Sequence, residues 1–248
     1  MKYDGFNFNP YLDISDIGRP LLPPQDIIDK KIMGKSGTYF LDKRHEPITI
    51  PVEVTLHEDV DLTYREKTRF IAGKLNKTEP KQLIFDDEPN VYINGIIRDS
   101  TDIENLIKAG QTTLEFYCPD PYYYEIDDEV FTYNGTGGYD FTREKGNVES
   151  FPVIEIEGSN SIGEIIIETD STSVTFDGDL TSGEILTFDS KLITAYVVQA
   201  DGTKRSANND LDTMDFPLLN VGANHIDVST TGNATVSEIR IYAKSMWV

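Results

Sequence analysis

The 248-residue chain contains one cysteine, three histidines and one tryptophan. The single cysteine, Cys118, cannot form a disulfide within the chain. It alternates with apolar neighbours, so we expect a buried residue that behaves as a small hydrophobe. The histidines His45, His57 and His225 are not spaced as a metal-ligand pair. These residue types therefore indicate no metal site.

The sequence also lacks the short motifs of common enzymes. It has no P-loop, no Gly-x-Gly-x-x-Gly segment and no Gly-x-Ser-x-Gly nucleophile elbow. No apolar run approaches the roughly 18 residues of a transmembrane helix, and the segment 1–8 has no apolar core typical of a signal peptide. We expect a protein made in a cytoplasm, with no catalytic, cofactor-binding or metal-binding residue.

Basic residues are scarce. The chain has 22 Lys and Arg against 43 Asp and Glu, a formal net charge of -21. Such a balance argues against tight binding to nucleic-acid phosphates or to anionic membrane surfaces. Eleven of the basic residues lie between Lys30 and Lys81. This mixed-charge strip is either a docking face or an ordinary solvated surface.

The most informative segment runs from Thr112 to Tyr124. Leu114, Phe116 and Cys118 alternate with polar residues, and this period of two predicts a strand with one buried face. Prolines 119 and 121 then end the strand, because they provide no N–H for a sheet. Three tyrosines follow, at 122–124.

The remainder of the first half also indicates β-structure. Residues 48–56 alternate cleanly, and Pro51 suggests an edge strand. Further strands are expected at 82–85 and 91–97. Residues 61–75 predict the only helix, with Asp61 or Thr63 as N-cap and a capping box from Thr63 to Glu66.

Residues 25–44 predict a β-hairpin whose turn contains Gly34 and Gly37. Its strands offer little apolar surface to bury, and an isolated hairpin is marginally stable at best. We therefore expect either an arm that projects towards a partner surface or a loose loop.

The pattern changes after the middle of the chain. Residues 136–150 are rich in turn residues and predict a linker between an N-terminal domain, 1–135, and a C-terminal domain, 151–248. The C-terminal domain contains short strands at regular spacing and no helix signal, which is typical of a β-sandwich or jelly roll. The strands are expected at 152–157, 163–169, 173–176, 184–188, 192–198, 224–228 and 236–242.

The order of these motifs resembles the distal tail proteins (Dit) of siphophages that infect Gram-positive bacteria. The similar segments are 3–6 (Tyr-x-Gly-Phe), the hairpin, 48–56, 69–75, 83–92, the phrase from Phe116 to Tyr122 with Cys118, Asp120 and Pro121, then 147–158, 183–189, 216–219, 222–224 and Trp247. They extend over nearly the whole chain. Single motifs are short, and their order and spacing carry the resemblance.

This resemblance implies a mainly β protein, with a β-sandwich-like N-terminal domain that carries one helix and the arm, and a galectin-like C-terminal domain. It implies a virion structural protein that forms a hexameric ring around the DNA channel at the tail tip. The ring joins the tail tube protein to the tail-associated lysin or fibre protein, and in some members anchors receptor-binding proteins. DNA would pass through without specific binding, and no membrane is involved.

The resemblance further implies that the arm lies on a neighbouring copy. The expected interface residues are Ile28, Lys30, Ile32, Gly34, Gly37 and Tyr39. The expected family-motif junction consists of Phe116, Cys118, Asp120, Pro121 and Tyr122. No long insertion is visible in the C-terminal half, which favours a simple tail tip.

Two other functions remain open from the residues alone. Tyr122–Tyr124 or the C-terminal sheet would suit a carbohydrate-binding module for bacterial cell-wall glycans. A glycan hydrolase would need two of the many carboxylates as a catalytic pair.

Overall fold

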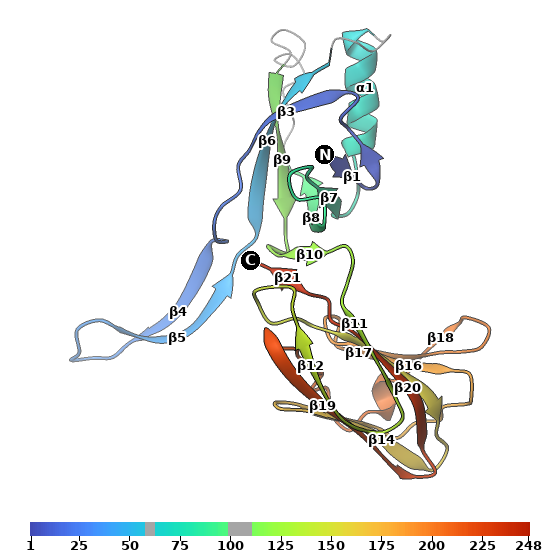
Figure 1. The fold of residues 1–248 in the computed structure, drawn as a ribbon. Helices are drawn as coiled ribbons and strands as arrows, with labels where there is room; N and C mark the ends of the chain where they lie inside the picture. Colours follow the sequence, from blue (N-terminus) through green and yellow to red (C-terminus); the bar gives the residue numbers. More distant parts are fainter. Residues whose placement is uncertain (58–62, 99–110) are drawn as a thin grey trace. The chain divides into compact units, whose positions relative to one another are not determined.

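The computed structural model describes residues 1–57, 63–98 and 111–248. It divides into two compact units, Met1–Ile126 with Val248, and Asp127–Trp247 (Figure 1). The protein is mainly β, as the sequence predicts, and α1 is the one α-helix of the described residues. In that part of the chain no helix is long and apolar enough to cross a membrane.

The first unit is built on a bent antiparallel sheet. The hydrogen-bonded strand order is β2-β1-β7-β8-β9-β6-β3, and β10 also pairs with β8. In chain order its elements are β1 (Lys2–Tyr3), β2 (Phe6–Asn7), β3 (Leu12–Ile17), β4 (Gln25–Lys31), β5 (Thr38–His45), β6 (Ile48–Leu56), α1 (Tyr64–Leu75), β7 (Lys81–Ile84), β8 (Val91–Ile97), β9 (Gln111–Cys118) and β10 (Tyr123–Glu125).

Strand β8 changes partners along its length. Residues Ile93 to Gly95 pair with β7, whereas Ile96 and Ile97 pair with β9. The sheet therefore bends at β8, and the core forms between its two parts. Tyr3 and Phe116 meet there edge to face, with ring centroids 5.3 Å apart.

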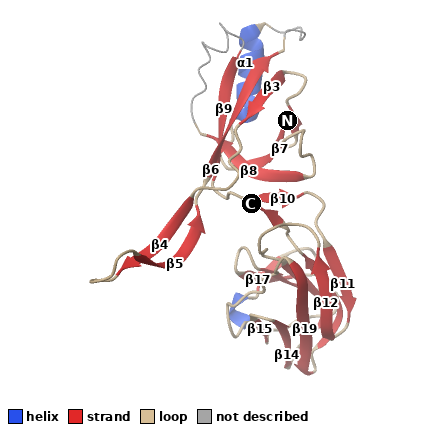
Figure 2. Ribbon diagram, turned by 60° about the vertical axis from the view of Figure 1, so that its left-hand side comes forward, coloured by secondary structure: helices blue, strands red, loops and turns tan. Residues whose placement is uncertain are grey.

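Helix α1 begins as the sequence predicts. Thr63 is the N-cap and forms a full capping box with Glu66. The Thr63 N–H donates to Glu66 Oε2 at 3.0 Å, and hydrogen bonds from Thr63 hold the pKa of Glu66 below its ordinary value. Ile71 and Leu75 bury the inner face of the helix, beside the strands seen in Figure 2. The other expected N-cap, Asp61, lies outside the described residues.

The expectation that Pro51 marks an edge strand is wrong. Strand β6 pairs with β9 on one side and β3 on the other. The ladder with β3 ends at the pair Ile17 and Val52, next to Pro51. The Gly18 N–H donates to the Pro51 carbonyl at 2.9 Å. A missing N–H is tolerated in a central strand here, because the adjacent strand ends at that point.

The second unit is a two-sheet β-sandwich. One sheet has the order β11-β20-β13-β16-β17-β18, and the other β12-β19-β14-β15. The elements are β11 (Val130–Asn134), β12 (Gly137–Arg143), β13 (Val153–Ser159), β14 (Gly163–Thr169), β15 (Ser173–Phe176), β16 (Ile185–Asp189), β17 (Thr194–Val198), β18 (Lys204–Ser206), the 3-10 helix η1 (Asn208–Asp210), β19 (Gly222–Gly232), β20 (Thr235–Tyr242) and β21 (Met246–Trp247).

The structure corrects the predicted linker at 136–150. Strand β12 fills half of that range and pairs with β19 along its whole length. Strand β11, assigned from sequence to the first domain, pairs with β20 of the second unit. The glycines at 135, 137 and 138 belong to the turn between β11 and β12, which lie in different sheets, and to the start of β12. Such a turn has the same composition as a linker.

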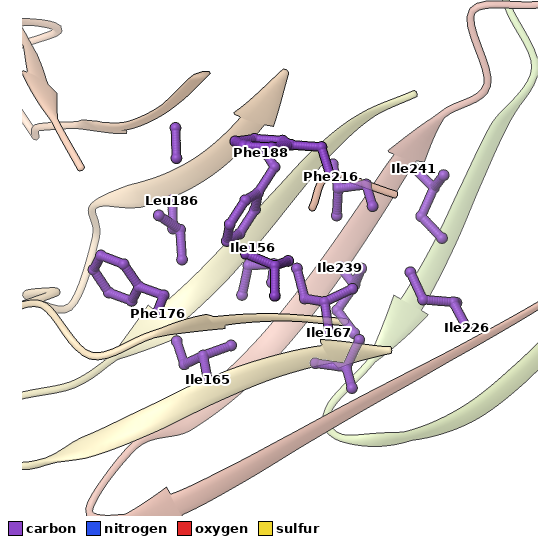
Figure 3. Packing of buried hydrophobic residues seen from close by; sticks show 14 of the residues in the cluster. Ile156, Ile165, Ile167, Phe176, Leu186, Phe188, Phe216, Ile226, Ile239 and Ile241 are labelled. Atoms are coloured by element: carbon purple, nitrogen blue, oxygen red, sulfur yellow. The ribbon is translucent and has the colours of Figure 1, made fainter. Parts of the chain in front are cut away.

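The sandwich core comes from both sheets. Ile156, Phe188 and Ile239 face Ile165, Ile167, Phe176 and Ile226, and all of these side chains are fully buried (Figure 3). Burying each such side chain contributes about 1.5–3 kcal/mol. The alternating pattern that predicted the strands is therefore the pattern of the core.

Gly158 gives a test of this packing. It lies at a bulge in β13, and a Cβ there would be 2.0 Å from the Thr235 carbonyl oxygen. We expect Gly158→Ala to lower the free energy of unfolding by about 1–3 kcal/mol, because the backbone of β20 must shift. Urea denaturation followed by tyrosine fluorescence measures the change.

Gly73→Ala is the matched control. Gly73 lies in α1 with open space around it, so alanine should raise the stability by about 0.5–1 kcal/mol through helix propensity. Equal effects of the two substitutions would contradict the packing described for Gly158.

Candidate assembly interface

The hairpin β4–β5 is a ribbon that forms its own two-stranded sheet. Both views show it apart from the strands of the main sheet of its unit (Figures 1 and 2). Residues 25–44 are all exposed except Ile28, which is partly buried. A two-stranded ribbon without a covering surface is marginally stable in water. The arm predicted from the sequence therefore exists, and it is unburied within the described chain.

The arm region also concentrates exposed apolar side chains. Among the described residues 18 large apolar side chains are exposed, and 8 of them lie between 21 and 41. These eight are Leu21, Leu22, Ile27, Ile32, Met33, Tyr39, Phe40 and Leu41. Exposed apolar side chains that are concentrated in one segment in this way favour a protein interaction site.

Sequence analysis missed most of these residues. Of the expected interface residues, only Ile32 and Tyr39 are exposed large apolar side chains, while Ile28 is partly buried and Lys30 is exposed. Phe40 and Ile27 are not among the expected residues, although they are 65% and 59% exposed. The pairing register of the hairpin shows that Ile27 and Phe40 share a face. A single sequence does not show this register.

Gly34 and Gly37 shape the tip of the arm. Both have φ of +84°, a left-handed conformation that glycine adopts without steric cost. Nothing lies within 4 Å of a Cβ built on either residue. Their role shown by the structure is in the turn, and contact with a partner stays a prediction for both.

The arm is basic on an acidic protein. Residues 25–45 hold five basic and three acidic residues, whereas the other 227 residues hold 17 basic and 40 acidic. The arm thus has a formal charge of +2 in a chain whose total is -21. Opposite charge favours association of the arm with a surface such as the rest of this chain.

The base of the arm is held by the junction motif. His45 Nδ1 lies 2.9 Å from the Tyr122 hydroxyl, and the two rings are 5.6 Å apart. Burial, together with the nearby Asp120 carboxylate, raises the pKa of Tyr122. The structure therefore brings the end of β5 together with a residue that the sequence placed in a separate motif.

The other junction residues are structural. Phe116 and Cys118 are fully buried in the core of the first unit, as their alternation predicts. The Tyr124 hydroxyl donates to the Asp120 carboxylate at 2.6 Å, and the Tyr124 ring stacks on Tyr92 with centroids 5.6 Å apart. Strand β9 ends at Cys118, before the two prolines.

The tyrosine run is not an exposed stacking platform. Tyr124 is buried, Tyr122 and Tyr123 are partly buried, and burial raises the pKa of Tyr123 to about 12. A sugar-binding platform needs aromatic faces open to solvent. The structure does not provide them at these residues.

The second unit contains a histidine–carboxylate pair. His225 Nδ1 lies 2.7 Å from Asp140, and this hydrogen bond raises the pKa of His225. In the described ranges, no group of three or more His, Cys, Asp or Glu side chains is placed to hold a metal ion.

Comparison with known proteins identifies the class to which this architecture belongs. The phage tail protein RIFT-related domain matches residues 10–118, and the siphovirus-type tail component C-terminal domain matches residues 145–243. Together they define a structural component of a phage tail. The chain belongs to the siphophage distal tail protein family.

The fold comparison agrees. The crystal structure of Dit of phage SPP1, described as a paradigm of the hub adsorption apparatus in Gram-positive infecting phages, matches with a TM-score of 0.76 and 14% identity. The match covers 99% of this chain and 98% of that chain.

A weaker match is a chain of the phage P2 baseplate in its activated conformation. It has a TM-score of 0.49 and 12% identity, over 97% of this chain and 93% of that chain. This likeness is too weak to support an inference. A search of curated proteins found no match.

Cys118 gives a test of the junction. Burial raises the pKa of its thiol to about 12, so at pH 8 almost none of it is thiolate, the reactive form. We expect a disulfide reagent to label native protein at least about a hundredfold more slowly than protein in guanidinium chloride. Absorbance of the released thiolate follows the reaction, and equal rates would show that the β9 terminus is open.

Proposed function

We propose that this chain is the hub of a siphophage tail tip, a homo-hexameric ring that surrounds the DNA exit channel. The ring would join the tail tube protein to the tail-associated lysin or fibre protein, and it would hold a receptor-binding protein where the phage has one. Membership of the distal tail protein family supports this role, as does the hub function stated for SPP1 Dit. The role is structural and requires no catalysis.

The observation that carries the proposal is the uncovered arm. A ribbon whose residues 25–44 are essentially unburied, and which concentrates apolar side chains, gains stability when another surface covers it. A neighbouring copy in a ring supplies such a surface for every arm at once.

The charge of the chain suits a channel for DNA. With a net charge of -21 per copy, a hexamer would repel phosphates over most of its surface. Repulsion keeps transiting DNA from binding to the wall. The protein would be made in the cytoplasm of the bacterial host and function in the virion.

Replacing the outer arm tests the ring. Ile28 and Asp42 are register partners, so a two-residue Asn-Gly turn can join them after removal of residues 29–41. We expect this variant to remain folded and to lose hexamers, because it lacks most of the exposed apolar residues. Mass photometry and light scattering measure the oligomer.

The wild-type chain is the reference, and far-ultraviolet circular dichroism checks that both units stay folded. Hexamers of undiminished stability in the shortened variant would contradict the role of the arm. A strict monomer that binds wall polysaccharide would instead favour the carbohydrate-binding alternative.

A further inference from the structure

The two faces of the arm differ, and the pairing register shows how. In an antiparallel ribbon, residues directly opposite each other point to the same side. Ile27 is opposite Lys43, and Asp29 is opposite Phe40. Since Ile27 and Asp29 are two positions apart on one strand, Ile27 and Phe40 share a face. We call this the Ile27–Phe40 face.

The opposite face contains Ile28 and Tyr39. Ile28 is opposite Asp42, and Tyr39 is opposite Lys30. The Tyr39 hydroxyl accepts a hydrogen bond from Lys35 Nζ at 2.5 Å, and the ammonium lies 5.1 Å from the ring centre. The aromatic group of this face is thus already engaged within the arm.

A β-bulge creates this difference. The register shifts between Ile28 and Asp29, which leaves Leu41 as the extra residue of β5. Without the shift, Phe40 would be opposite Lys30 and would lie on the face of Ile28, because a one-residue slip moves a side chain to the other side. The bulge instead places the most exposed aromatic ring of the arm on the same face as Ile27.

Charge indicates what covers this face. Lys31 and Lys43 border it, against the single acid Asp29. On the opposite face Lys30 and Arg44 are matched by two acids, Asp26 and Asp42. An apolar centre with a basic border complements an acidic surface, and the rest of this chain has 40 acidic and 17 basic residues.

We propose that the Ile27–Phe40 face, selected by the bulge at Leu41, is the surface by which the arm packs onto a second copy of this chain. The Ile28–Tyr39 face takes no part in this contact. The inference rests on the ring proposed above and deepens it, because it names the side of the arm that is buried and the residues that anchor it.

Two matched double variants test the choice of face. Ile27→Thr with Phe40→Thr, and Ile28→Thr with Tyr39→Thr, each remove one isoleucine and one aromatic ring from one face. Threonine retains strand propensity in both. Oligomer is measured by mass photometry and light scattering over a range of protein concentration, and folding by circular dichroism and thermal unfolding.

We expect the Ile27/Phe40 variant to need at least about a hundredfold higher concentration to assemble, as follows from losing two buried apolar side chains at each contact. The Ile28/Tyr39 variant should assemble within about threefold of the wild type. Both should unfold at the wild-type temperature when measured at a concentration where all three proteins are monomeric, since the altered side chains are outside the core and assembly itself raises the unfolding temperature.

The outcomes separate the two proposals. If the wild type forms rings and the Ile27/Phe40 variant forms them equally well, the assignment of the face is overturned. The same holds if both variants lose the rings to the same extent. Neither result contradicts the hub. A wild type that is monomeric at every concentration overturns the hub itself. A photo-reactive phenylalanine analogue at position 40 should cross-link to a second copy, and cross-linking only within one copy would also overturn the assignment.

Discussion

The two strands of the arm pair with each other but leave nearly all of their side chains exposed. Strands β4 and β5 pair with each other along seven register positions, so their hydrogen bonds do not require the remainder of the sheet. The apolar side chains of the arm cannot be buried within it, because two strands enclose no interior. The hydrophobic effect therefore favours any arrangement that covers the arm, and a ring of identical copies covers every arm with one repeated contact.

This constraint explains why the base of the arm is built as it is. The arm leaves the sheet beside β6, a central strand, and His45 at its end contacts Tyr122 in the junction motif. Tyr122 in turn follows a strand whose Phe116 and Cys118 are in the core. The arm thus starts from a well-packed part of the first unit, although its outer residues pack on nothing in the described chain.

Much of the fold was predictable because its signals are local. Alternation over 48–56, 111–118 and the strands of the second half reflects burial of one face, and the capping box from Thr63 to Glu66 is a property of four consecutive residues. The linker predicted at 136–150 was wrong because the glycine-rich turn between β11 and β12 has the same composition as a linker. The prediction that Pro51 lies in an edge strand was wrong. A proline is tolerated in a central strand wherever the neighbouring strand provides no hydrogen-bond partner at that one position, and β3 ends next to Pro51.

The candidate interface was predictable as a segment and not as a surface. The amino-acid sequence by itself determined that residues near 25–45 form a glycine-turned hairpin with a basic balance and no core to join. Only the tertiary structure decided which side chains share a face, because a bulge at Leu41 reverses the alternation and nothing in the local sequence marks it. The physical reason is that register is a relation between two strands, while a sequence pattern describes one strand at a time.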